Sequence, residues 1–80
     1  MAMWETLMPN WIPVTDSSRI VAAAYDSQSQ AIHVHFLDGA QYCYEECSQS
    51  IWSQFTAPGV SKGAFINSEL NKHPYHRRNS

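Results

Sequence analysis

The sequence predicts an α+β fold, in which a three-stranded antiparallel meander is covered on one face by a C-terminal helical segment. Residues 19–46 hold short β-prone runs with alternating apolar side chains, whereas residues 48–72 show the spacing of helices. Strands followed by helices are typical of α+β domains. The gaps between the predicted strands are too short for crossover helices, so the sheet is expected to be antiparallel.

The chain of 80 residues allows one domain with a thin core, because a chain of this size buries only about 60 to 65% of its unfolded surface. We divide it into an apolar arm at 1–16, a domain at 17–75 and a basic tail at 76–80. The arm begins MAMWETLMPNWIP, with two prolines and no basic residue, which fits neither a signal peptide nor a membrane span. Two cysteines suit reduced thiols. We therefore expect a cytoplasmic protein with no membrane partner.

The charge is distributed unevenly along the chain. The formal net charge is -2, which argues against a general nucleic-acid coat. The first 60 residues contain six acidic residues and one basic residue, Arg19. The last 20 residues contain four basic residues and one acidic residue. Binding of an anion is therefore expected at the C-terminal end.

The first strand is expected at residues 19–25, between Asp- and Ser-rich stretches that favour turns. A β-hairpin should follow, since Ile32, Val34 and Phe36 alternate with polar residues before the turn at Asp38 and Gly39. A second alternating run comes after that turn.

The length of the hairpin loop decides which way the two tyrosines point. A two-residue loop would pair His35 with Tyr42 and leave both rings outside. A three-residue loop, with Gly39 as the bulge residue, would pair Val34 with Tyr42 and turn both rings inward. We favour the bulged register because it separates apolar from polar residues. Its inner face holds Ile32, Val34, Phe36, Ala40, Tyr42 and Tyr44, and its outer face holds His33, His35, Gln41, Cys43 and Glu45.

Two helices are expected after the hairpin. The first should be capped by Ser48 or Ser50 and should turn Ile51 and Phe55 toward the core, ending at the Pro-Gly pair at 58–59. The second should open near residue 61, use the apolar residues of 65–70, and end before Pro74.

With these elements assigned, the chain resembles the KTSC domain, a short module found at the C-terminus of some lysyl-tRNA synthetases and alone in bacterial and phage proteins. The resemblance covers about residues 17–75. It is carried by SSRI, AYD, HVHFLDG, YCY, SKG, FIN and Tyr75. The chain departs from the usual Val-Pro at the start of the helix, where it has Cys47 and Ser48. The resemblance implies RNA binding only through the association with a tRNA synthetase.

Neither a metal site nor catalysis is indicated by the sequence. His33, His35, Cys43 and Cys47 form a C-x3-C and an H-x-H on a strand, which is not the spacing of zinc ligands. A Cys/His nucleophile would need a third, orienting group and a cleft that excludes water. We expect no metal, no cofactor and no enzymatic activity.

The Ser-Lys-Gly segment at 61–63 precedes a helical run and is a candidate anion site, because Ser can cap a helix while free N–H groups and Lys62 attract negative charge. A plain helix cap remains the alternative. The site would gain stacking and charge if the tail folded back beside it, whereas a solvated tail would add nothing. The predicted ligand-binding residues are Arg19, Tyr44, Ser61, Lys62, Gly63, Asn67, Lys72, Tyr75, Arg77 and Arg78.

Two functions follow as hypotheses. The first is a small non-catalytic binding module for RNA or a phosphate-bearing nucleotide. The alternative is a homo-oligomeric protein-interaction or assembly unit, including a phage-encoded sponge for a nucleotide signal. In that alternative Trp4 and Trp11 of the arm cover the outer sheet face of the same chain or of a neighbour.

Overall fold

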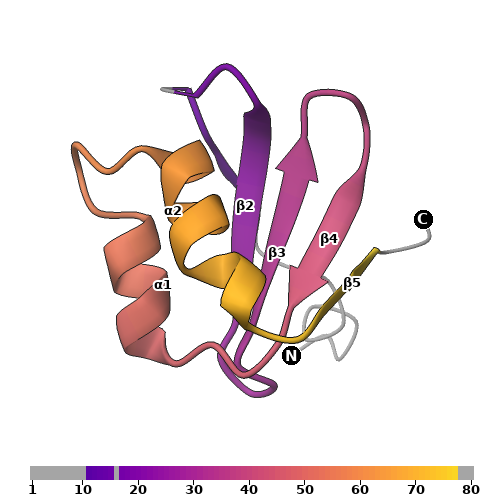
Figure 1. Ribbon diagram of the computed structural model, residues 1–80, viewed down its shortest axis with the longest axis vertical. Helices are drawn as coiled ribbons and strands as arrows, with labels where there is room; N and C mark the ends of the chain where they lie inside the picture. Colours follow the sequence, from indigo (N-terminus) through magenta and orange to yellow (C-terminus); the bar gives the residue numbers. More distant parts are fainter. Residues whose placement is uncertain (1–10, 16, 78–80) are drawn as a thin grey trace, which may run out of the picture.

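The computed structural model describes residues 11–15 and 17–77 as a five-stranded antiparallel sheet with two helices on one face (Figure 1). Trp4 and Arg78 lie outside the described residues. The strands follow one another in the order β1-β2-β3-β4-β5. The elements are β1 (Ile12–Pro13), β2 (Ile20–Asp26), β3 (Ala31–Phe36), β4 (Gln41–Tyr44), α1 (Gln49–Phe55), α2 (Lys62–Ser68), the 3-10 helix η2 (Leu70–Lys72) and β5 (Tyr75–Arg77).

The α+β class is confirmed, but the prediction of three strands was wrong because β1 and β5 extend the sheet. These strands have two and three residues, which is too short for a visible alternation of apolar and polar side chains. In addition, β1 contains Pro13 and β5 follows Pro74, and a proline in the sequence normally interrupts a strand. Pro13 is accommodated because β1 is an edge strand, where a missing N–H need not cost a ladder hydrogen bond.

The bulged hairpin register is confirmed. Ile32 pairs with Tyr44, and Val34 pairs with Tyr42. The Phe36 N–H donates to the Ala40 carbonyl at 2.8 Å, which closes a three-residue loop. Gly39 in that loop has φ 95°, a left-handed conformation that glycine adopts without steric cost. Both tyrosines of β4 therefore point to the face that the helices cover.

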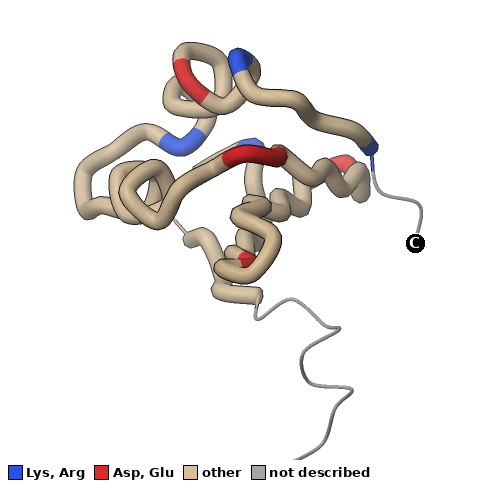
Figure 2. The backbone as a smooth tube through the Cα atoms, turned by 90° about the horizontal axis from the view of Figure 1, so that it is seen from below, with Lys and Arg blue, Asp and Glu red and all other residues tan. Residues whose placement is uncertain are grey.

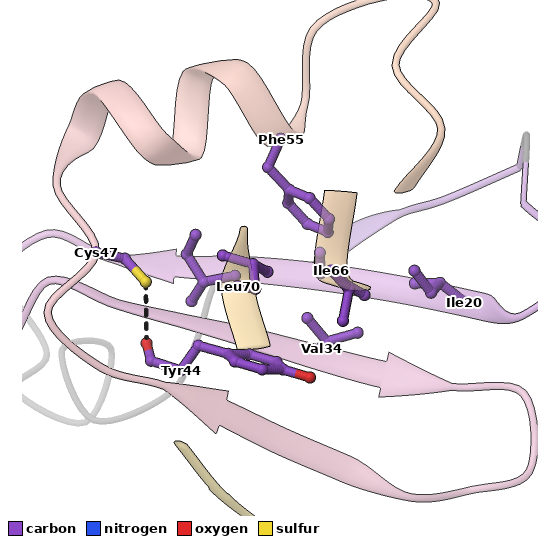
Figure 3. Packing of buried hydrophobic residues seen from close by; sticks show 9 residues of the cluster. Ile20, Val34, Tyr44, Cys47, Phe55, Ile66 and Leu70 are labelled. Atoms are coloured by element: carbon purple, nitrogen blue, oxygen red, sulfur yellow. Dashed lines mark hydrogen bonds between the residues drawn. The ribbon is translucent and has the colours of Figure 1, made fainter. Parts of the chain in front are cut away.

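The core lies between this inner face and the helices (Figure 3). Ser48 caps α1 by accepting a hydrogen bond from the Ile51 N–H, as predicted, and the helix turns Phe55 into the core. Ile66 of α2 and Leu70 of η2 complete the packing. The buried core cluster consists of Ile20, Ala23, Ile32, Val34, Tyr44, Cys47, Phe55, Ile66 and Leu70.

The outer face of the sheet is in contact with Trp11. Its indole centroid lies 6.3 Å from the ring of His33 and 6.1 Å from that of His35. Cys43, which pairs with His33 on this face, is buried to 7% exposure. Part of the predicted arm thus covers the outer face of its own chain. None of the helices in the described ranges has the length and hydrophobicity of a membrane span.

Candidate ligand-binding pocket

A pocket of about 370 Å³ opens on the inner face, between the sheet edge formed by β4 and β5 and the helical segment of α2 and η2. We call it the tyrosine pocket. It is lined by Arg19, Phe36, Asp38, Ala40, Tyr42, Tyr44, Ile66, Asn67, Asn71, Tyr75 and Arg77. Its walls come from the turn before β2, the β3–β4 hairpin, α2, η2 and β5, which the sheet and helices bring together.

The pairing of β4 with β5 builds the aromatic wall of the pocket. Tyr44 is opposite Tyr75, and Tyr42 is opposite Arg77. The ring centroids of Tyr44 and Tyr75 are 5.3 Å apart, and those of Tyr42 and Tyr75 are 6.1 Å apart. Phe36 continues the wall with its ring edge-on to Tyr42 at 5.7 Å. The rings thus form one cluster, whose outermost member, Tyr75, is 49% exposed.

Tyr44 forms the base of the cluster and is only 2% exposed. In Figure 3 its ring lies along β4 with the hydroxyl pointing away from Cys47. The pKa of this phenol is raised to about 12, mainly by burial and also by the neighbouring phenols of Tyr75 and Tyr42, while the charge of Arg19 acts in the opposite direction. At neutral pH the hydroxyl is therefore protonated and can donate a hydrogen bond into the pocket.

The positive charges of the pocket come from Arg19 and Arg77. Arg19 precedes β2, in a turn where its N–H donates to the Ser17 hydroxyl at 3.2 Å. Its guanidinium lies beside the start of α2. The approach is close enough that a Cβ atom on Gly63 would lie 3.5 Å from Arg19 Nη1. Arg77 is on β5, opposite Tyr42. Figure 2 shows the Lys and Arg positions spread along the backbone, with Asp and Glu positions between them.

Half of the predicted ligand-binding residues line this pocket, namely Arg19, Tyr44, Asn67, Tyr75 and Arg77. Of the other five, Ser61, Lys62, Gly63 and Lys72 are not among the lining residues, and Arg78 lies outside the described residues. Ser61 caps α2, since its hydroxyl accepts from the Ala64 N–H at 3.4 Å. Lys62 is 8% exposed, so little of it is open to a ligand.

Sequence reasoning did not assign Phe36, Tyr42 and Asn71 to the site. Tyr42 could have been found, because the favoured register already placed it on the same face as Tyr44. Asn71 of η2 follows Asn67 of α2 by four residues, and both side chains line the pocket. The return of the chain as β5, which makes the pocket, carried no comparable signal.

In the described part of the chain, the outer face and the thiols do not form a metal site. Within residues 11–15 and 17–77, no three His, Cys, Asp or Glu side chains are grouped closely enough to hold a metal ion. His76 Nδ1 lies 3.1 Å from Glu45 Oε2. Burial raises the pKa of the Cys47 thiol to about 11, so this thiol is poorly nucleophilic at neutral pH.

Comparison with known proteins agrees with the resemblance found in the sequence. The model of the KTSC domain matches residues 16–75, which include every residue that lines the tyrosine pocket except Arg77. The crystal structure of a KTSC domain protein from Yersinia pestis is similar, with a TM-score of 0.81 and 25% identity, over 90% of this chain and 100% of that one. The search of curated proteins found no match. The chain belongs to the KTSC domain family.

Proposed function

We propose that this protein is a non-catalytic binding module for a nucleotide, either free or as a unit of single-stranded RNA. The observation that carries the proposal is the composition of the tyrosine pocket, in which an accessible aromatic ring, two guanidinium groups and two amides line one opening. These are the three kinds of group that a nucleotide needs for its base plane, its phosphate and its base edge. A cytoplasmic location is part of this proposal, since RNA and nucleotides are abundant there.

The exposed ring of Tyr75 is the natural platform for a base. Base stacking on an aromatic side chain is worth about 1–3 kcal/mol and tolerates any base. Arg19 and Arg77 lie at the same opening and supply bidentate donors for a phosphate. Asn67 and Asn71 carry amides that can both donate to and accept from the edge of a base.

The acid and base groups of the pocket suit binding rather than catalysis. Tyr44 holds its proton well above neutral pH. Asp38 Oδ1 accepts a hydrogen bond from the Ala40 N–H at 3.0 Å, so this carboxylate is engaged in the hairpin turn. General acid-base catalysis needs groups whose pKa lies near the working pH. The Tyr44 hydroxyl does not meet that requirement.

The test is the salt dependence of binding to a fluorescent single-stranded RNA oligonucleotide. The logarithm of affinity should fall with the logarithm of salt concentration by roughly 0.7 for each phosphate contact. Arg19→Gln and Arg77→Gln should each reduce the slope by about that amount. Tyr75→Ala should weaken binding by about 1–3 kcal/mol with little change in slope.

Lys72→Gln is the matched control, because it removes the same charge from an exposed residue outside the pocket. It should change the slope less than either arginine variant. The proposal is contradicted if neither RNA nor mononucleotides bind, or if Lys72→Gln changes the slope as much as Arg19→Gln and Arg77→Gln do.

The second proposal, homo-oligomeric assembly, is favoured by the edge strand β5, whose three residues are exposed. An unpaired edge can accept a strand from another chain. Two copies joined in this way would bring two tyrosine pockets near one interface, as a phage-encoded sponge for a nucleotide signal would require. Light scattering of the full chain tests this arrangement, and a monomer at every concentration that still binds nucleotide would contradict it.

A further inference from the structure

A second hollow of about 350 Å³ adjoins the tyrosine pocket at the hairpin end of the sheet. We call it the hairpin hollow, and it is lined by Ser18, Arg19, Phe36, Leu37 and Asp38. Three of these residues, Arg19, Phe36 and Asp38, also line the tyrosine pocket. The two hollows are therefore neighbouring compartments with a shared wall. Each falls near the lower end of the size range of small-molecule sites, roughly 300–1,000 Å³.

Leu37 supplies the apolar surface of the hairpin hollow. It is 70% exposed, the largest value among the exposed large hydrophobic residues in the described ranges. The buried core cluster does not include it. Its backbone N–H donates to the Arg19 carbonyl at 2.8 Å, which fixes the hairpin against the turn before β2. An apolar side chain is thus held in solvent beside a guanidinium group.

The charge of the combined compartments suits one phosphodiester. Two arginines and one aspartate among the described lining residues leave a formal charge of +1. A phosphodiester carries a single negative charge, whereas a terminal phosphate carries about 1.5 to 2. Asp38 borders both compartments and would repel the second charge of a terminal phosphate. Arg19, which is also shared, is placed to hold the phosphate that links two units.

We infer that the ligand of this site is a phosphodiester-linked pair of nucleotides, with one base on Tyr75 in the tyrosine pocket, the other against Leu37 and Phe36 in the hairpin hollow, and the linking phosphate at Arg19. This inference rests on the proposed function and narrows it to a two-nucleotide unit. In this arrangement Leu37 contacts the ligand. Because its side chain is largely in solvent and outside the buried core cluster, substituting it should not disturb the fold. The single ring exposed at Tyr75 holds only one of the two bases.

The test compares the affinities of adenosine monophosphate and of adenylyl-(3′→5′)-adenosine for the full chain by calorimetry. The dinucleotide should bind more tightly, by roughly 5- to 150-fold if the second base contributes as one stacked base does. Leu37→Ser should reduce this advantage and leave the affinity for the mononucleotide unchanged. Tyr75→Ala should weaken both ligands.

The outcomes separate the inference from the proposed function. If the two ligands bind equally well, or if Leu37→Ser weakens both of them equally, the two-compartment site is wrong and the nucleotide site stands. If neither ligand binds, both are wrong. Circular dichroism of Leu37→Ser should match that of the parent chain, since the substituted side chain lies largely in solvent.

Discussion

Tyr44 connects the core of this protein to its pocket. Its ring packs within the buried cluster, while the phenols of Tyr42 and Tyr75 lie beside it. The pKa of Tyr44, about 12, lies above the ordinary value of 10.0 mainly because burial disfavours the phenolate. The folded chain therefore keeps a proton that the unfolded chain releases above pH 10. The resulting contribution to stability is fully present below that pH and is lost as the pH rises through 12.

Tyr44→Phe should therefore flatten the alkaline part of the stability profile. Urea unfolding of the parent chain should show a free energy of unfolding that declines between pH 10 and 12, and the variant should show a smaller decline. The remaining decline is assigned to other groups, such as Cys47, whose pKa is also raised by burial. Equal declines in the two proteins would show that the Tyr44 hydroxyl titrates as it does in water.

Cys47 gives a second prediction at this scale. The side chain is fully buried and its pKa is raised to about 11, so very little thiolate is present at neutral pH. Cys43 is also buried. A thiol reagent should therefore modify both cysteines only at the rate at which the chain unfolds, and a denaturant should make both reactive at once. Fast modification of either thiol in the folded chain would contradict this burial.

The hairpin is the element that sets the orientation of the aromatic wall. Its register was predictable because only one of the two loop lengths separates apolar from polar side chains. The strands β1 and β5 were not predictable, since strands of two and three residues carry no periodic signal. Only part of the pocket could therefore be predicted from the sequence. The inward orientation of Tyr42 and Tyr44 follows from the hairpin register, whereas the position of Arg77 opposite Tyr42 depends on β5.

The loop residue Gly39 tests the register. With φ at 95°, Gly39→Ala should lower the free energy of unfolding by about 1–2 kcal/mol. Gly39→Asn is the matched variant and should be less costly, because Asn tolerates positive φ. Thermal or urea unfolding measures both. Equal effects of Ala and Asn would contradict the left-handed conformation on which the three-residue loop depends.

A substitution at the start of α2 can distinguish the two roles that the sequence allows for Ser61, a plain helix cap or part of an anion site. As a plain cap, Ser61→Ala should lower the free energy of unfolding by about 1 kcal/mol and leave nucleotide affinity unchanged. As part of an anion site, it should weaken binding at conditions where the protein remains folded. Unfolding and binding measured on the same preparation distinguish them, and the pocket described above predicts the first result.

At the scale of the whole molecule, the thin core makes single contacts costly. Leu70 is fully buried between the sheet and the helices. Leu70→Ala should cost roughly 2–5 kcal/mol, a large part of the 5–15 kcal/mol typical of a domain. Leu37→Ala removes the same atoms from a residue that is 70% exposed and should change stability by less than about 0.5 kcal/mol. Similar losses for the two variants would mean that the helices do not close over the inner face.

The two faces of the sheet differ in what they contact. The inner face holds the core over most of its width and opens into the tyrosine pocket at the β4–β5 edge, where the charge and the amides gather. The outer face carries His33 and His35 against Trp11. The proposed nucleotide site therefore lies at one edge of one face.

An NMR titration of the uniformly ¹⁵N-labelled full chain with adenylyl-(3′→5′)-adenosine tests this assignment most directly. The backbone amides that shift should cluster at residues 18–19, 36–38, 67–71 and 75–77, which border the two compartments. The amides of β1 and those of α1 should stay in place. Shifts centred on His33 and His35, or no shifts at all, would contradict a nucleotide site on the inner face.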